Sequence, residues 1–294
     1  MVKNYNYNYN IKEPVVIPYN NKNKLIKDTN VKKILKSLNI NVDITDIEIY
    51  RKSLTHKSYI KKEYYTNHKN DLENAKNKMS ENILDLREQS NERLEFLGDT
   101  IIKAVVSHYL FERYPNEDEG FMTRLKTKIE NQKSLARFAR KIGIDEFIII
   151  SVQNEFGNIG RTNDKILEDA FESFLGALYL DCGFLVCKRF MRYILENYID
   201  YSDLLYNDDN FKDQLLRVYH SFKWEHPKYV VISQEGPPHK RVFTIGVYDN
   251  ENRIVGKATD TSKKRAEQKA SKMALYYYKK LNHDQLNDNI YKLI

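Results

Sequence analysis

The hydrophobic period of the chain changes near residue 200, and this change restricts the fold more than any other feature. Before that point apolar residues recur at helical spacing, in segments at 31–40, 91–113, 120–142, 162–181 and 183–199. After it, a helical segment at 211–222 precedes "KYVVIS", "RVFTIGVYD" and "RIVGKATD", which have the composition of strands. A last helical segment follows, with Thr261 or Ser262 as its expected N-cap. The sequence predicts an all-α domain followed by an α-β-β-β-α (α+β) domain.

The same patterns set the expected boundaries. Residues 1–30 are rich in Asn, Tyr and Lys without periodicity, so we expect a disordered extension. The helical domain is expected at 31–200, with a charged, exposed insertion at about 61–90 that is partly helical at most. A linker is expected at 201–210, the α+β domain at 211–282 and a tail at 283–294. The apolar run "FIIISV" (147–152) is the exception to the helical patterns before residue 200.

Charge is distributed unevenly along the 294 residues. Residues 211–281 hold 15 Lys+Arg against 7 Asp+Glu, although the net charge of the whole chain is only +7. A basic domain beside a near-neutral body predicts a polyanionic partner. No apolar run approaches the roughly 18 residues of a membrane span, and the start lacks the apolar core of a secretory signal. Because the chain has only two cysteines, we expect no disulfide framework. From these features together we expect no membrane partner and an intracellular, cytoplasmic location.

The stretch "NERLEFLGDT" (91–100) carries three acids at helical spacing. Glu92, Glu95 and Asp99 fall within about 60° of arc, opposite an apolar face. One interpretation is a solvated helix face with an Asp99–Lys103 pair. The other is a set of carboxylates held together for chemistry.

A second segment, "ILEDAFESFLGALYLD" (166–181), repeats the arrangement with Asp169, Glu172 and, one turn later, Gly176. A glycine inside a helix costs about 1 kcal/mol relative to alanine, and its expected use here, as at Gly98, is close helix packing. Two acidic faces packed together would repel unless a cation or protons neutralised them. Oxygen ligands without cysteine favour Mg²⁺ or Mn²⁺. A di-iron carboxylate bundle is disfavoured, because no histidine follows a glutamate at i+3.

These stretches resemble the ribonuclease III family. The similarity covers "LTHKSY" (54–59), "NERLEFLGDT", "NEDEGFMTRLKTKI" (116–129) and "LEDAFESFLGALYLD" (167–181), and the C-terminal unit resembles a double-stranded RNA-binding domain. The resemblance implies an endonuclease that cuts double-stranded RNA, works as a homodimer and uses Mg²⁺, for which Mn²⁺ substitutes. It implies products with 5′-phosphate and 3′-hydroxyl ends and short 3′ overhangs. The insertion at 61–90 departs from the usual bacterial form.

The resemblance also assigns roles to residues. Glu95, Asp99, Asp169 and Glu172 match catalytic metal ligands, Glu119 matches an acid at the cleavage site, and Glu92 matches an acid associated with substrate or the dimer. His56 of "LTHKSY" is interpreted as structural. In the C-terminal domain, the residues expected to contact RNA are Gln214, Gly236, Pro237, His239, Lys263, Lys264 and Gln268.

The lysines at the start of the last helix also stand out on physical grounds. Cations there oppose the helix dipole unless a phosphate binds at that end. Such a domain would recognise the shape of an A-form duplex rather than its sequence. The rival interpretation of the whole chain is a non-catalytic protein that sequesters double-stranded RNA. The four matching acids argue against it, because a binding protein has no need of metal ligands.

Overall fold

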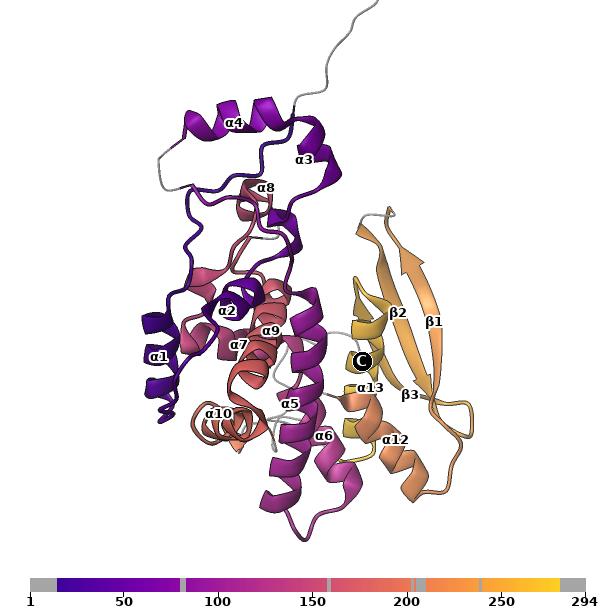
Figure 1. Cartoon of the computed structure of the whole chain (residues 1–294). Coiled ribbons are helices and arrows are strands. Elements are labelled where there is room, and N and C mark those ends of the chain that lie inside the picture. Colours follow the sequence, from indigo (N-terminus) through magenta and orange to yellow (C-terminus); the bar gives the residue numbers. More distant parts are fainter. Residues whose placement is uncertain are drawn as a thin grey trace, which may run out of the picture. The chain divides into compact units, whose positions relative to one another are not determined.

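A computed structural model of the chain divides into two compact units, with the division after Leu204 (Figure 1). The structure describes residues 15–79, 83–157, 160–201, 204, 210–237 and 240–280. The first unit is helical, and the second is a three-stranded sheet with two helices, as the change of period predicts. None of the helices in these ranges is long and apolar enough to cross a membrane. The intracellular location remains a prediction.

The first unit is built around one buried helix, α9 (Asp164–Cys182), whose Phe171 and Phe174 are fully buried. Helices α2 (Ile47–Ser53), α5 (Glu92–Arg113), α7 (Gln132–Ile142) and α10 (Phe184–Asn197) pack against α9. Within the described ranges the unit also contains α1 (Asp28–Ser37), α3 (Glu63–Asn67), α4 (Lys69–Asn77), α6 (Glu119–Ile129) and α8 (Val152–Phe156), with short 3₁₀ turns η1 (Lys57–Tyr59) and η2 (Asp145–Phe147).

The segment 120–142, predicted as one helical pattern, forms two helices. Helix α6 ends at Ile129, and α7 begins after Asn131, whose side chain accepts a hydrogen bond from the Ser134 amide at 3.0 Å. An N-cap of this kind satisfies a donor at the start of a new helix. The apolar spacing continues across the break, so periodicity alone does not reveal it.

The expectation of a disordered extension at 1–30 is wrong for residues 15–30; residues 1–14 lie outside the described ranges. The segment 15–27 forms a strap across the helical unit, and α1 follows it. Asn20 and Asn23 are buried, and both amides donate to the Ile150 carbonyl, at 3.2 and 2.9 Å. The Ile150 amide donates to Asn23 in return, at 3.1 Å. Polar residues hold this segment in place by hydrogen bonding to backbone, which a reading of hydrophobic period overlooks.

The insertion at 61–90 contains α3 and α4 and contributes to a small core of its own. Leu72, Ile83 and Leu86 are buried together with Tyr19 of the strap and Tyr59 of η1. The apolar run at 147–152 joins this region without forming a strand. It contributes one isolated bridge, Thr55 to Ile149, before α8 begins. Residues 148–151 of this run are buried, and Phe147 and Val152 at its two ends are partly buried.

The second unit follows the expected α-β-β-β-α order. Helix α12 (Phe211–Ser221) precedes the antiparallel strands β1 (Lys228–Glu235), β2 (Val242–Tyr248) and β3 (Ile254–Asp260), and α13 (Lys263–Tyr277) ends the unit. The strand order is β1-β2-β3, so β1 and β3 are the edges. One face of the sheet packs on α13, where Ile245, Val247 and Ala270 are buried. A β-bulge between Val231 and Ser233 interrupts the register of β1 with β2.

Candidate catalytic and RNA-binding sites

Helices α5 and α9 approach each other to backbone contact. A Cβ atom added at Gly98 would lie 1.7 Å from the backbone oxygen of Glu172, and one added at Gly176 would lie 2.4 Å from that of Leu94. No side chain fits at either position, so the packing role predicted for both glycines is confirmed. This approach brings the acidic faces of the two helices together.

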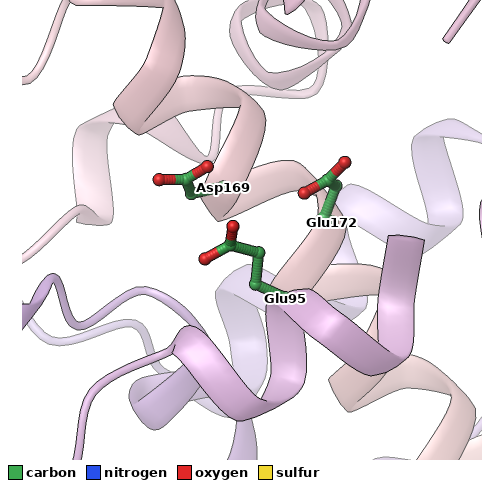
Figure 2. Close-up of side chains that lie close together, drawn as sticks. All are labelled: Glu95, Asp169 and Glu172. Atoms are coloured by element: carbon green, nitrogen blue, oxygen red, sulfur yellow. The ribbon is translucent and has the colours of Figure 1, made fainter. Parts of the chain in front are cut away.

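Three carboxylates meet at this crossing. Glu95 of α5 and Asp169 and Glu172 of α9 each offer an oxygen, and these oxygens lie within 4.8 Å of one another (Figure 2). Glu172 is buried, with 7% of its surface exposed, and the other two are partly buried. Among the described residues no sulfur or imidazole joins these oxygens, so the donors are those that Mg²⁺ and Mn²⁺ prefer.

Without a counter-ion, the carboxylates of the cluster repel one another when they are ionised. Burial, and then the charge of Asp169, raise the pKa of Glu95 to about 7. Burial, and then the charge of Asp99, raise the pKa of Glu172 to about 8. Both shifts show that ionised carboxylates are disfavoured here, so a bound cation would be stabilised by the groups that now repel one another.

Lys165, which the sequence reasoning missed, supplies positive charge at this site. Its ammonium lies 2.7 Å from Asp169, 3.1 Å from Glu168 and 3.9 Å from Glu95. Burial lowers the pKa of Lys165, but the hydrogen bonds that its ammonium donates to Asp169 and Glu168 outweigh this effect and hold the pKa above its usual value. The spacing offered a clue, because Lys165 precedes Asp169 by one helical turn.

Asp99 is not among the three clustered acids. Its carboxylate pairs with Lys103 at 2.6 Å, one turn along α5, as the simpler of the two interpretations anticipated. Glu130, which follows the last residue of α6, is an acid that the sequence reasoning missed. One of its oxygens is buried without a hydrogen-bond partner, and burial raises the pKa of Glu130 to about 7.

The remaining candidate acids lie outside the cluster. Glu119 begins α6, is exposed, and accepts a hydrogen bond from Thr123 at 2.8 Å. Glu92 begins α5 and contacts Ser90 at 2.9 Å and Lys57 at 3.3 Å. The hydrogen bond from Ser90 and the contact with Lys57 lower the pKa of Glu92. His56 caps η1 by accepting from the Ser58 amide at 3.2 Å, which agrees with a structural role.

In the second unit, the N-terminal end of α13 is basic and has no side-chain cap. Ser262 occupies the N-cap position, as one of the two residues predicted there, but its side chain makes no capping hydrogen bond. The first turn holds Lys263 and Lys264, and the ammonium of Lys263 lies 5.4 Å from the centre of the Phe243 ring. The uncapped amides and the two ammonium groups all favour an anion at this end.

Asp260 holds two further cations in place behind this end. Its carboxylate contacts Arg265 and Lys269, each at 3.0 Å. Burial raises the pKa of Asp260, but hydrogen bonds and these cations outweigh it, so the net pKa lies below the usual value. Lys263 and Lys264 form no such ion pair with any residue of the described ranges.

The other residues expected to contact RNA lie on different elements of the second unit. Gln214 lies on α12, and Gly236 and Pro237 are exposed after β1. Gly236 has a φ of +88°, which favours glycine, and a Cβ there would meet the Lys240 backbone oxygen at 2.7 Å. Gln268 accepts from the Lys212 amide at 3.1 Å and donates to Asn210 at 3.0 Å, so its amide joins α13 to α12. His239 lies outside the described residues.

Comparison with family models identifies residues 46–198, more than half of the chain, as Ribonuclease-III-like. The chain belongs to the ribonuclease III family. A second match, the double-stranded RNA binding motif, covers residues 211–278. The predicted family and fold class are thus confirmed, and the chain is an enzyme of the double-stranded RNA-specific endoribonuclease class with a double-stranded RNA-binding domain.

Relatives of the ribonuclease III chain come from a virus and from bacteria. It is 36% identical over 269 residues to "Probable ribonuclease 3" of Acanthamoeba polyphaga mimivirus, covering 91% of this chain but only 48% of that relative. It is 32% identical over 247 residues to "Ribonuclease 3" of Borreliella afzelii, covering 83% of this chain and 90% of that relative. A solved nuclease domain of ribonuclease III from Campylobacter jejuni is 33% identical, covers 58% of this chain and 99% of its own, and aligns with a TM-score of 0.44.

Proposed function

We propose that the chain hydrolyses double-stranded RNA with divalent metal ions, Mg²⁺ or Mn²⁺, held by Glu95, Asp169 and Glu172. The observation that carries the proposal is the meeting of three carboxylate oxygens within 4.8 Å at a partly buried helix crossing. We assign Asp99 to the same ligand set, because it lies one turn from Glu95 and its charge raises the pKa of Glu172. When bound, such ions would activate the attacking water and stabilise the departing 3′ oxygen.

The residues around the carboxylates have supporting roles in this proposal. Lys165 pairs with Asp169, with its ammonium 2.7 Å from the carboxylate, and so places a positive charge beside the cluster. The buried position of Glu172 limits the access of water to its carboxylate. Glu119 and Glu92 are proposed to act on the substrate from outside the metal cluster. Cleavage would leave 5′-phosphate and 3′-hydroxyl ends with short 3′ overhangs.

We further propose that the enzyme acts as a homodimer, with one site cutting each strand. Phe96 supports this, since the residue is 79% exposed and directly follows Glu95 on α5. Aromatic side chains are enriched at protein interfaces, so Phe96 is a suitable anchor for such a contact. The first unit would supply this contact, and the second unit would bind the duplex through the basic end of α13.

The sequestering protein is the competing proposal, and the carboxylate cluster argues against it. Crowding ionisable acids in a partly buried site destabilises the fold unless the site is used. A binding protein would gain nothing from keeping Glu95 and Glu172 where their pKa values are raised.

The experiment is incubation of the full chain with a long RNA duplex, with Mg²⁺, with Mn²⁺ and with a chelator, followed by analysis of the product ends. We expect cleavage only with a divalent ion, 5′-phosphate and 3′-hydroxyl termini, and a short 3′ overhang. Intact duplex in every condition, although the protein binds it, would support the sequestering protein instead. Cleavage in the chelator would refute the metal requirement.

A further inference from the structure

Strand β1 exposes an apolar edge that the proposed catalytic function does not use. In the part of the chain that the structure describes, β2 is the one strand beside it, so the other side of β1 carries backbone groups without a strand partner there (Figure 1). Three successive aliphatic residues, Val230, Val231 and Ile232, are 46%, 42% and 40% exposed. Edge strands are usually blunted by charge, proline, a β-bulge or cover, because an open edge accepts another strand. The centre of β1 has a bulge but no charge or proline, and no segment of the described ranges pairs with its free side.

The apolar character extends onto the outer face of the sheet. The Ile232 side chain lies across Gly246 of β2, since a Cβ added at Gly246 would meet it at 2.8 Å. Ile254 of β3 is also exposed, at 49%. The free edge and its adjoining face therefore offer backbone hydrogen bonds together with apolar surface, which is the combination that strand addition uses.

The charges of β1 indicate which strand would fit. Its sequence, "KYVVISQE", begins with exposed Lys228 and ends with exposed Glu235, and neither forms an ion pair with another residue of the described ranges. If two copies of β1 lie antiparallel about a two-fold axis between Val231 and Ile232, Lys228 of each copy faces Glu235 of the other. Val231 and Ile232 then lie nearest the axis, and Val230 lies opposite Ser233. The strand is thus complementary to itself in charge, and its exposed apolar residues lie in the middle of the pairing.

We propose that β1 is a self-association surface, which pairs with β1 of a second copy of this chain in a two-fold antiparallel ladder. A two-fold contact of this kind uses the same patch on both copies and closes on itself. The bulge between Val231 and Ser233 lies at the proposed two-fold axis and increases the local twist of β1. Both copies carry the same bulge, so it is compatible with the two-fold symmetry. This contact does not depend on the proposed nuclease dimer, since it belongs to the other unit. The two contacts together would join chains in series along a long duplex.

Charge reversal with rescue tests the proposal, without RNA and in the full chain. Sedimentation velocity is measured across a concentration series at low salt, in a Phe96→Glu background that removes the proposed nuclease contact. The two-fold pairing contains two contacts between residues 228 and 235, so Lys228→Glu or Glu235→Lys creates two pairs of like charges. Each single variant should therefore weaken association by roughly tenfold. The double variant K228E/E235K restores opposite charges and should restore association. Within one strand the two residues are about 23 Å apart, so rescue requires a second copy.

Lys257→Glu is the matched control, because Lys257 is an exposed lysine on β3, the other edge of the sheet. It changes the net charge as Lys228→Glu does but should leave association unchanged. Circular dichroism verifies that each variant is folded. The proposal is overturned if the background protein is monomeric at every concentration, if the single variants associate normally, or if the double variant stays as weak as the single ones. Should Phe96→Glu leave association as it is in the wild type, the role of Phe96 in the nuclease contact is refuted, and the charge series still reports on β1.

Discussion

Replacing Gly98 by alanine should separate the two helices that carry the carboxylates. The added Cβ would start 1.7 Å from the Glu172 backbone oxygen and must reach at least 3.0 Å. The obstructing atom belongs to the backbone of buried α9 and cannot rotate away. Overpacking of this kind costs about 1–3 kcal/mol, from which the better helix propensity of alanine returns up to about 1 kcal/mol. We expect a net loss of about 1–2 kcal/mol in the free energy of unfolding.

The effect on cleavage should exceed the effect on stability. A shift of α5 moves Glu95 away from Asp169 and Glu172, and a misplacement of about 1 Å in a catalytic constellation costs on the order of 10²-fold in rate. Urea unfolding followed by circular dichroism measures stability, and single-turnover cleavage of a long duplex with Mg²⁺ measures the rate. Duplex binding should be unaffected, because the second unit is unchanged.

Gly120→Ala is the control for the unfolding measurement. A Cβ at Gly120 meets only the Arg124 and Asp118 side chains, at 3.3 and 3.4 Å, and the arginine can move. This variant should be as stable as the wild type or more stable. If Gly98→Ala is also as stable as the wild type and cleaves at the same rate, then backbone contact between α5 and α9 does not position the carboxylates.

Three further predictions follow from the two sites. Glu172→Gln keeps the size of a proposed metal ligand but removes its charge, so RNA affinity should persist while cleavage nearly disappears; a wild-type rate in saturating Mg²⁺ contradicts the assignment. In a chelator, stability should fall as pH rises from about 4.5 towards about 8, because Glu95 and Glu172 keep protons in the folded state that the unfolded state has lost. Mg²⁺ at pH 8 should restore the melting temperature, and a melting temperature insensitive to both pH and Mg²⁺ counts against a crowded carboxylate site. Replacing Lys263 and Lys264 by alanine should preserve the fold and weaken binding to all duplexes alike. The slope of log affinity against log salt should fall by about one unit per lysine if the duplex behaves like B-DNA. An unchanged slope means that RNA is held elsewhere.

Hydrophobic period was sufficient to predict the helical unit, the order of the α+β unit and the glycine-mediated crossing. In any helix, a 3.6-residue repeat places Glu95 on the same face as Gly98, and Glu172 on the same face as Gly176. The same repeat could not decide how the acids are partnered. Asp99 shares a helix face with Glu95, yet its carboxylate pairs with Lys103, while Lys165 enters the cluster. Rotamers and local ion pairs decide these contacts, and spacing does not encode them.

Polar contacts account for the other differences. Asn131 separates α6 from α7 by capping, although the apolar pattern runs on across it. Asn20 and Asn23 are buried because they hydrogen-bond to Ile150, although an Asn-rich segment resembles disorder in its composition. Both cases depend on where the partner backbone lies in three dimensions, which the local sequence does not specify.

The strap formed by residues 15–27 has a consequence for the order of folding. Asn23 and Ile150 are 127 positions apart in sequence, so the strap cannot be fixed until about half of the chain has been synthesised. Contacts of such long range form late, because a large loop must close before they contribute. During synthesis Ile150 and its neighbours emerge long after the segment that covers them. The strap therefore takes its place only long after it has itself been synthesised.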